Sequence, residues 1–198
     1  MLDFSNSKIL IVGDVMLDKY YFGKVDRISP EAPVPIVNIQ KEESRLGGAS
    51  NVANNIVSLG GHSLLCGVIG HDLFGKEIER ISRHKNIDTF LLKTSSPTIT
   101  KARIIGGKQQ IVRVDYEDKS ELNADNKKLF RDTISRILPE YDILVISDYG
   151  KGLISEDLCR YLIKLAHKYD KKVIIDPKGK NWEKYSGADI VTPNVKEL

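Results

Sequence analysis

The chain has 198 residues, of which 41% are hydrophobic and 29% are charged, a balance typical of a folded globular protein and unlike that of a disordered one. Thirty Lys and Arg residues against 27 Asp and Glu residues give a net charge of +3. This charge is too small and too evenly spread to indicate a nucleic acid or an anionic membrane as a partner. The two cysteines, Cys66 and Cys159, are too few for a four-cysteine zinc site or a disulfide framework.

The sequence shows neither a membrane span nor a secretory signal. Its apolar runs fall short of the roughly 18–20 residues that cross a bilayer. Residues 1–10 (MLDFSNSKIL) contain Asp3 and lead directly into a strand-like run, which is not the pattern of a signal peptide. We therefore expect a cytoplasmic protein.

Short β-branched runs alternate along the chain with stretches of helical periodicity. Strands are predicted over 8–12, 64–69, 143–147, 173–176 and 190–192, and helices over 49–59, 74–81, 130–138 and 158–169. Gly60 and Gly61 end the first helix, Asn123 or Asp125 caps the third, and Ser155 caps the fourth. The strands are almost continuously apolar, as in parallel sheets that helices cover on both faces. The pattern predicts an α/β protein with a doubly wound, mostly parallel sheet.

Two segments break this alternation. Residues 19–42 hold three prolines between extended stretches, and residues 99–115 predict a hairpin that turns at Gly106-Gly107. One face of the hairpin carries Lys101 and Arg103, which is not typical of a buried core. We expect the two segments to form a small β-layer that stands off the main sheet as a lid or a dimer surface.

The end of the chain follows the last predicted strand closely. Residues 193–198 resemble the opening turn of another helix, and no helix body follows to cover residues 190–192. An uncovered strand would leave an apolar face in water. We therefore expect residues 1–198 to be the front part of a longer protein.

Two acidic residues follow the first predicted strand, at Asp14 and Asp18. Ligands of open α/β sheets bind beyond the carboxyl ends of the strands. Carboxylates accept hydrogen bonds from hydroxyl groups, which suits a polyol substrate. A turn cap at Asp14 and a solvated Asp18 would explain the segment equally well, so both interpretations stay open.

A pair of glycines, Gly47 and Gly48, opens the first helix. Glycine lets a ligand approach the backbone, and free N–H groups at a helix start favour anions or hydroxyl oxygens. The spacing matches neither the dinucleotide fingerprint nor the P-loop. An ordinary turn is an equally simple explanation, and Asn51 is either a ligand-facing amide or a cap.

Further polar residues follow the later strands. Asp148 comes directly after residues 143–147, and Lys178 lies on a loop beside Gly179, where a lysine can act as a flexible phosphate ligand. Asn194 and Glu197 lie three residues apart on the incipient helix and would share a face. An amide and a carboxylate so arranged can hold a hydrated Mg²⁺ ion beside phosphates. Each of these features alone is nonspecific.

The order of these features along the chain resembles the PfkB (ribokinase-like) family of carbohydrate kinases. The similar segments are GDVMLDKYYFG (13–23), GGASNVANNIVSLG (47–60), SDYGKG (147–152), DPKG (176–179) and TPNVKE (192–197), together with QQIVRVD (109–115). RISPEAPVPIV (27–37) and PTITKARII (97–105) resemble the branch that acts on a heptose 7-phosphate, often the front domain of a bifunctional kinase/adenylyltransferase.

The resemblance implies transfer of the ATP γ-phosphate to O1 of D-glycero-β-D-manno-heptose 7-phosphate, a step in lipopolysaccharide core synthesis, with Mg²⁺ as a cofactor and a K⁺ requirement left open. The substrate-binding residues that it implies are Asp14, Asp18, Gly47, Gly48, Asn51 and Asp148, with Lys101, Arg103 and Arg113 as candidates for the 7-phosphate. The ATP-binding residues that it implies are Lys178, Asn194, Val195, Lys196 and Glu197, with Asn194 and Glu197 reaching Mg²⁺ through water.

Residues 19–42 and 97–115 correspond to the β-lid of that family, which implies a homodimer formed through the lid. The family's catalytic base is the Asp of a downstream Gly-Ala-Gly-Asp loop, and no G-x-G-D occurs in residues 1–198. We therefore expect the catalytic Asp to lie beyond Leu198, and this stretch alone to show no appreciable turnover. The alternatives are a kinase for another sugar or sugar phosphate and a non-catalytic sugar-phosphate-binding or dimerisation module. A nucleotide-dependent oxidoreductase is disfavoured because no G-x-G-x-x-G follows the first strand.

Overall fold

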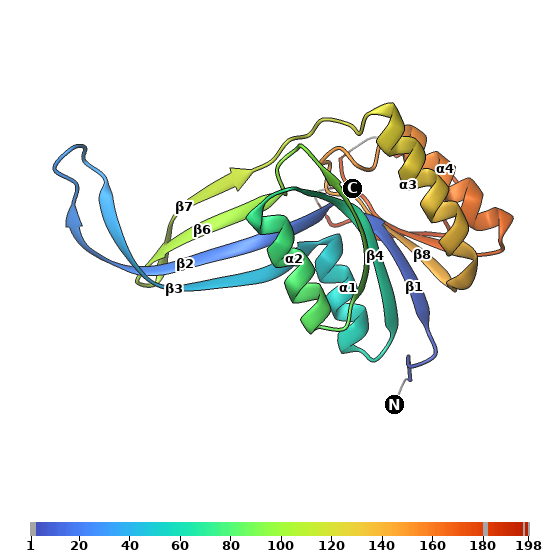
Figure 1. Ribbon diagram of the computed structural model, residues 1–198, viewed down its shortest axis with the longest axis horizontal. Coiled ribbons are helices and arrows are strands. Elements are labelled where there is room, and N and C mark those ends of the chain that lie inside the picture. The colour runs from blue at the N-terminus through green and yellow to red at the C-terminus, as the bar shows by residue number, and fades with distance from the viewer. Residues whose placement is uncertain (1–2, 180–181, 196, 198) are drawn as a thin grey trace.

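The computed structural model describes residues 3–179, 182–195 and 197, which form an α/β body and a β-sheet that projects from it (Figure 1). The strands are β1 (Lys8–Gly13), β2 (Val15–Ile28), β3 (Pro35–Gly48), β4 (His62–Gly70), β5 (Asp88–Thr94), β6 (Thr100–Gly106), β7 (Gln109–Tyr116), β8 (Ile143–Ser147), β9 (Lys172–Asp176) and β10 (Ile190–Val191). The α-helices are α1 (Ala49–Ser58), α2 (Leu73–His84), α3 (Ala124–Ile137) and α4 (Glu156–Lys168), and the 3₁₀ helices are Leu138–Glu140 and Glu183–Tyr185.

The body is built on a parallel sheet with the strand order β10-β9-β8-β1-β4-β5. Alternate residues of β1 face opposite sides. Leu10 and Val12 pack into a core with residues of α3 and α4, whereas Ile11 packs with residues of α1 and α2. Helices therefore cover both faces of the sheet (Figure 1), which confirms the predicted doubly wound α/β fold.

The predicted helix starts are confirmed by their capping bonds. Asn123 Oδ1 accepts from the Asn126 N–H at 2.9 Å, and Ser155 Oγ accepts from the Leu158 N–H at 3.3 Å. Of the two residues predicted for the third helix, Asn123 is therefore the cap and Asp125 lies in the first turn.

One strand was not predicted. β5 runs along the edge of the body sheet beside β4, and most of its side chains are exposed or half-buried. Its sequence, DTFLLKT, has polar residues at both ends and lacks the continuous apolar character of the central strands.

The projecting sheet, which we call the lid, has the strand order β3-β2-β6-β7. β2 pairs with β3 and β6 with β7 in antiparallel fashion, and β2 and β6 are parallel. The lid is larger than residues 19–42 and 97–115, because β2 begins at Val15 and β3 continues to Gly48. The predicted hairpin is present, and Gly107 forms its turn with φ +63°. In the part of the chain that the structure describes, no helix is long and apolar enough to cross a membrane.

Candidate functional site

A cavity of about 630 Å³ lies between the base of the lid and the start of α1. It brings together six of the residues predicted to bind substrate: Asp18, Gly47, Gly48, Asn51, Lys101 and Arg103. Its polar lining also includes residues that were not predicted: Ser44, Arg45, Asn54, Lys85 and Tyr149. Segments far apart in sequence thus converge on one polar pocket at the carboxyl edge of the body sheet.

The Gly-Gly bend at the end of β3 brings the backbone close to the acidic residues. A Cβ on Gly47 would lie 2.5 Å from Asp18 Oδ2, and a Cβ on Gly48 would overlap the Asp14 carbonyl oxygen. Gly48 also has φ +54°, a conformation that side chains disfavour. It caps α1 without a side-chain hydrogen bond, so the first turn of the helix opens toward the pocket. The bend therefore requires glycine for physical reasons beyond an ordinary turn.

Charged side chains alternate across the pocket-facing side of the lid. The strand register places Arg45, Asp18, Lys101 and Asp115 side by side on β3, β2, β6 and β7. The next row on the same face holds Glu43, Tyr20, Arg103 and Arg113. Opposite charges on neighbouring strands attract, but Arg103 and Arg113 face each other directly with the same charge.

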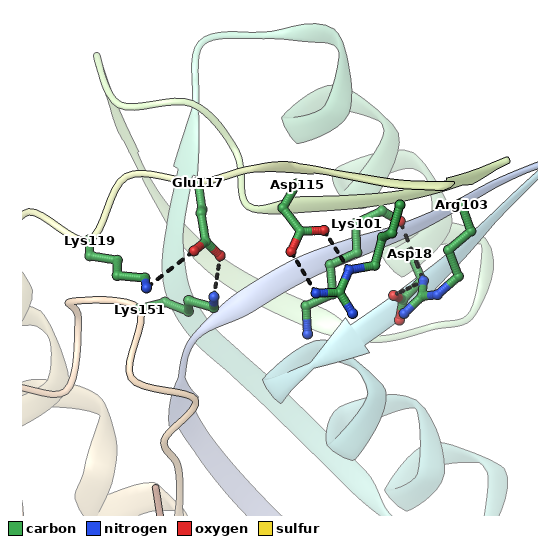
Figure 2. Close-up of polar contacts among 8 residues, drawn as sticks. Asp18, Lys101, Arg103, Asp115, Glu117, Lys119 and Lys151 are labelled. Carbon is green, nitrogen blue, oxygen red and sulfur yellow. Dashed lines mark hydrogen bonds and ion pairs between the residues drawn. The ribbon is translucent and has the colours of Figure 1, made fainter. Parts of the chain in front are cut away.

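Asp18 is ion-paired within this face. Arg103 Nη1 donates to Asp18 Oδ1 at 2.6 Å, as Figure 2 shows, and both side chains are only about one-fifth exposed. Tyr20 lies between two guanidinium groups, with Arg103 5.1 Å and Arg45 4.9 Å from the ring centroid. The aromatic ring thus supports both arginines at the wall of the pocket.

Lys101 is the exceptional cation of the lid face. None of the ion pairs found among the described residues uses it. Burial lowers the pKa of Lys101; Asp18 opposes this effect, while the nearby charges of Lys151, Arg113 and Arg103 add to it. A half-buried ammonium group among three like charges creates a strong local preference for an anion.

Arg113 lies outside the pocket lining. Its guanidinium is exposed and makes two bonds to Asp115, at 2.8 and 2.9 Å. Figure 2 shows a similar arrangement farther along the lid, where Glu117 contacts Lys119 and Lys151. Arg113 therefore borders the site through its cross-strand neighbour Arg103.

The structure does not place Asp14 or Asp148 in this pocket, and their predicted contact with substrate is not supported. Asp14 is buried, and its Oδ2 accepts from the N–H groups of Tyr149 at 2.8 Å and Lys151 at 3.1 Å. Burial raises the pKa of Asp14, and these backbone hydrogen bonds oppose the effect. Asp14 thus fastens the loop after β8 to the end of β1.

Asp148 is buried in a polar network beneath the same loop. Its Oδ2 lies 2.5 Å from Lys184 Nζ and accepts from the Tyr185 hydroxyl at 2.8 Å, while its Oδ1 accepts from the Gly150 N–H at 2.8 Å. The Lys178 N–H donates to the same Tyr185 hydroxyl at 2.9 Å. Asp148 therefore joins the loops that follow β8 and β9, which is a structural role.

The residues predicted to bind ATP form a second polar group after β9 and β10. Lys178 Nζ lies 3.1 Å from Glu197 Oε1, and Glu197 Oε2 accepts from the Asn194 N–H at 3.0 Å. The Asn194 bond, with help from Lys178, lowers the pKa of Glu197. Val195 is 89% exposed, and Lys196 lies outside the described residues. The structure thus brings Lys178, Asn194 and Glu197 together.

The catalytic Asp expected from the family pattern has no counterpart among the described residues. It was predicted to lie beyond Leu198, and Leu198 itself lies outside the part of the chain that the structure describes. The position of the base therefore stays a prediction, and the described residues supply the sugar pocket, the lid and the second polar group.

A directly bound metal ion finds few ligands in this region. Among the described residues there is no group of three or more His, Cys, Asp or Glu side chains placed to hold one. Glu197 keeps lone pairs beyond the two contacts above, because a carboxylate offers about four acceptor sites. The arrangement therefore fits a metal held partly through water and phosphate oxygens.

The comparisons with known proteins agree with this geometry. The family model described as "pfkB family carbohydrate kinase" matches residues 6–198. The chain belongs to the pfkB family. It is 48% identical over 193 residues to the bifunctional protein HldE of Helicobacter pylori (strain P12), covering 96% of this chain and 42% of that protein. It is 45% identical over 195 residues to the D-beta-D-heptose 7-phosphate kinase of Bordetella bronchiseptica, covering 98% of this chain and 61% of that protein.

Solved structures support the fold of this pfkB chain. The tetrameric inhibited form of phosphofructokinase-2 from Escherichia coli matches with a TM-score of 0.73 and 21% identity over 96% of this chain and 62% of that one. A carbohydrate kinase from Agrobacterium tumefaciens matches with a TM-score of 0.69 and 17% identity over 93% of this chain and 60% of that one. The chain thus spans roughly two-fifths to three-fifths of the length of the proteins it matches.

Proposed function

We propose that residues 1–198 form the N-terminal part of a sugar kinase domain that phosphorylates D-glycero-β-D-manno-heptose 7-phosphate at O1 with ATP. The product would be the 1,7-bisphosphate that feeds lipopolysaccharide core synthesis, and we place the protein in the cytoplasm. One observation carries the proposal: a polar cavity joins Asp18, the Gly-Gly bend and Asn51 to a cationic lid face. The name of the Bordetella bronchiseptica relative supports the choice of substrate.

The two sides of the pocket suit the two ends of such a substrate. Asp18, Asn51 and the backbone at Gly48 offer acceptors and donors for hydroxyl groups. Lys101 and Arg103 face them across the cavity, with Arg113 behind, and would bind the 7-phosphate. The sugar would then lie with its phosphate on the lid and its hydroxyl groups over the start of α1.

The second polar group would serve the nucleotide. Lys178 supplies a cation for phosphate oxygens, and Asn194 with Glu197 would contact Mg²⁺ through water. Mg²⁺ neutralises phosphate charge during transfer, and the protein's main tasks are to position the reactants and to provide a base for the attacking hydroxyl. In the family that this chain resembles, that base lies in a Gly-Ala-Gly-Asp loop, which residues 1–198 do not contain and which we place beyond Leu198.

We also propose that two copies associate through the lid. Several large apolar side chains of the lid are exposed, among them Val25, Ile28, Val34, Ile39, Ile111, Val112 and Val114. Exposed apolar patches of this kind mark interaction surfaces. Light scattering coupled to gel filtration would test the proposal, since a monomer at micromolar concentration would contradict it.

A coupled assay of ADP release tests the proposed activity. The chain of residues 1–198 should show no appreciable turnover, whereas a version extended by roughly 120 residues, a length based on typical domain sizes, should phosphorylate the heptose. A panel of free and phosphorylated sugars on the extended protein would identify the substrate. Robust turnover by the short chain, or a preference for an unrelated sugar, would contradict the proposal.

A further inference from the structure

The Asp18 carboxylate is already engaged on both sides. Its Oδ1 accepts a charge-assisted hydrogen bond from Arg103, and its Oδ2 lies against the backbone of Gly47. The pair is partly shielded from water, with each side chain about one-fifth exposed. A sugar hydroxyl that is to donate to Oδ1 therefore competes with a guanidinium group.

Arg103 has a second set of neighbours that would receive it with an anion. It lies directly across from Arg113 on β7, and Lys101 is two residues before it on the same face of β6. The aromatic ring of Tyr20 supports its guanidinium group from β2. Like charges on neighbouring strands repel, so an anionic group among these three cations would stabilise the arrangement.

We propose that Arg103 makes the pocket selective for phosphorylated sugars over free ones. The phosphate of the substrate binds between Arg103, Lys101 and Arg113, and thereby competes with Asp18 for the guanidinium group. Asp18 Oδ1 is then open to a sugar hydroxyl. A free sugar brings no anion and has to displace Arg103 unaided. This inference rests on the proposed function, and it assigns the choice between the two ligand classes to one ion pair.

Calorimetric titration of the chain with heptose 7-phosphate and with unphosphorylated heptose tests the inference. In Arg103→Gln, the phosphorylated sugar should bind about 10- to 100-fold more weakly, because a charge-assisted bond is lost. The free sugar should bind about two- to fivefold more tightly, since Asp18 is no longer covered. Arg103→Lys should keep part of the preference. It also provides the test if the glutamine variant does not fold, which a thermal melt would reveal.

Arg45→Gln is the matched control. Arg45 also lines the pocket and packs on Tyr20, but its ion pair is with Glu43 at 2.8 Å. Its loss should change the ratio of the two affinities by less than about threefold. Equal weakening of both ligands in Arg103→Gln would show that Arg103 merely positions Asp18, and would overturn this inference alone. Binding of neither ligand by the unmodified chain would overturn the proposed function and this inference with it.

Discussion

Replacing Lys184 by methionine should destabilise the protein, because Asp148 would remain buried without its ion-pair partner. Lys184 Nζ lies 2.5 Å from Asp148 Oδ2 and donates to the Ile154 carbonyl at 3.0 Å, and the two charged side chains are 16% and 1% exposed. Breaking one side of a buried ion pair costs about 3–5 kcal/mol. Because the Tyr185 hydroxyl and the Gly150 N–H still donate to Asp148, we expect a loss near the lower value.

Equilibrium unfolding in urea measures the change in the free energy of unfolding. The control is Lys172→Met, since Lys172 is 74% exposed and pairs with Asp189 at 2.8 Å on the surface. Exposed pairs contribute little, so this variant should unfold close to the unmodified protein. A double variant with Lys184→Met and Asp148→Asn removes both charges and should recover part of the lost stability.

Two results would refute this reasoning. If Lys184→Met were no less stable than Lys172→Met, the pair would not be buried in solution and Asp148 would lose its structural role. If Asp148→Asn kept full stability but weakened sugar-phosphate binding, the substrate contact predicted from the sequence would be restored.

Three further outcomes are expected. Gly48→Ala should destabilise the chain by about 1–3 kcal/mol, from its backbone conformation alone, and should weaken sugar binding; thermal melts and titration measure the two effects. Lys101→Met should raise the Michaelis constant or the Kd for heptose 7-phosphate about tenfold or more without lowering the melting temperature, because no ion pair is lost. The raised pKa of Asp14 means that the folded state holds its proton more tightly than the unfolded state. Its contribution to stability is therefore present below the unfolded pKa of about 3.8 and is lost as the pH rises through the folded pKa, so Asp14→Asn should gain stability relative to the unmodified protein over that interval.

Each outcome has a clear opposite. An unchanged melting temperature for Gly48→Ala would mean that the bend accepts a side chain. An unchanged affinity for heptose 7-phosphate in Lys101→Met would remove Lys101 from the phosphate site. A constant stability difference between the Asp14→Asn variant and the unmodified protein from pH 3 to pH 7 would show that Asp14 is not desolvated.

The central strands and the helix starts could be predicted because their signals are local. β1 and β8 are continuous apolar runs, and Asn123 and Ser155 are caps that bond to N–H groups three residues ahead. β5 escaped prediction because an edge strand is only partly buried and keeps polar residues. The full length of β2 and β3 was also missed, because their outer halves carry charged side chains into water.

The site was predictable where topology alone decides the position. The carboxyl ends of parallel strands meet at one edge, so Asp18, Gly48 and Asn51 were expected together and do line one cavity. The same rule could not say which way an acidic side chain turns, and Asp14 and Asp148 turn toward the loop after β8. Arg45 could have been found by extending the period-two alternation of β3 as far as the glycine pair.

The passage between the two sheets has a consequence for how they can move. Only Asp14 separates β1 of the body from β2 of the lid, and β3 returns directly into α1 at Gly48. These two crossings are joined, because the Ala49 N–H donates to the Asp14 carbonyl at 3.0 Å. They form a double pivot at the floor of the cavity. Any tilt of the lid on this pivot changes the spacing between Asp18 and the glycine bend first, so closure and grip on a sugar ring are one motion.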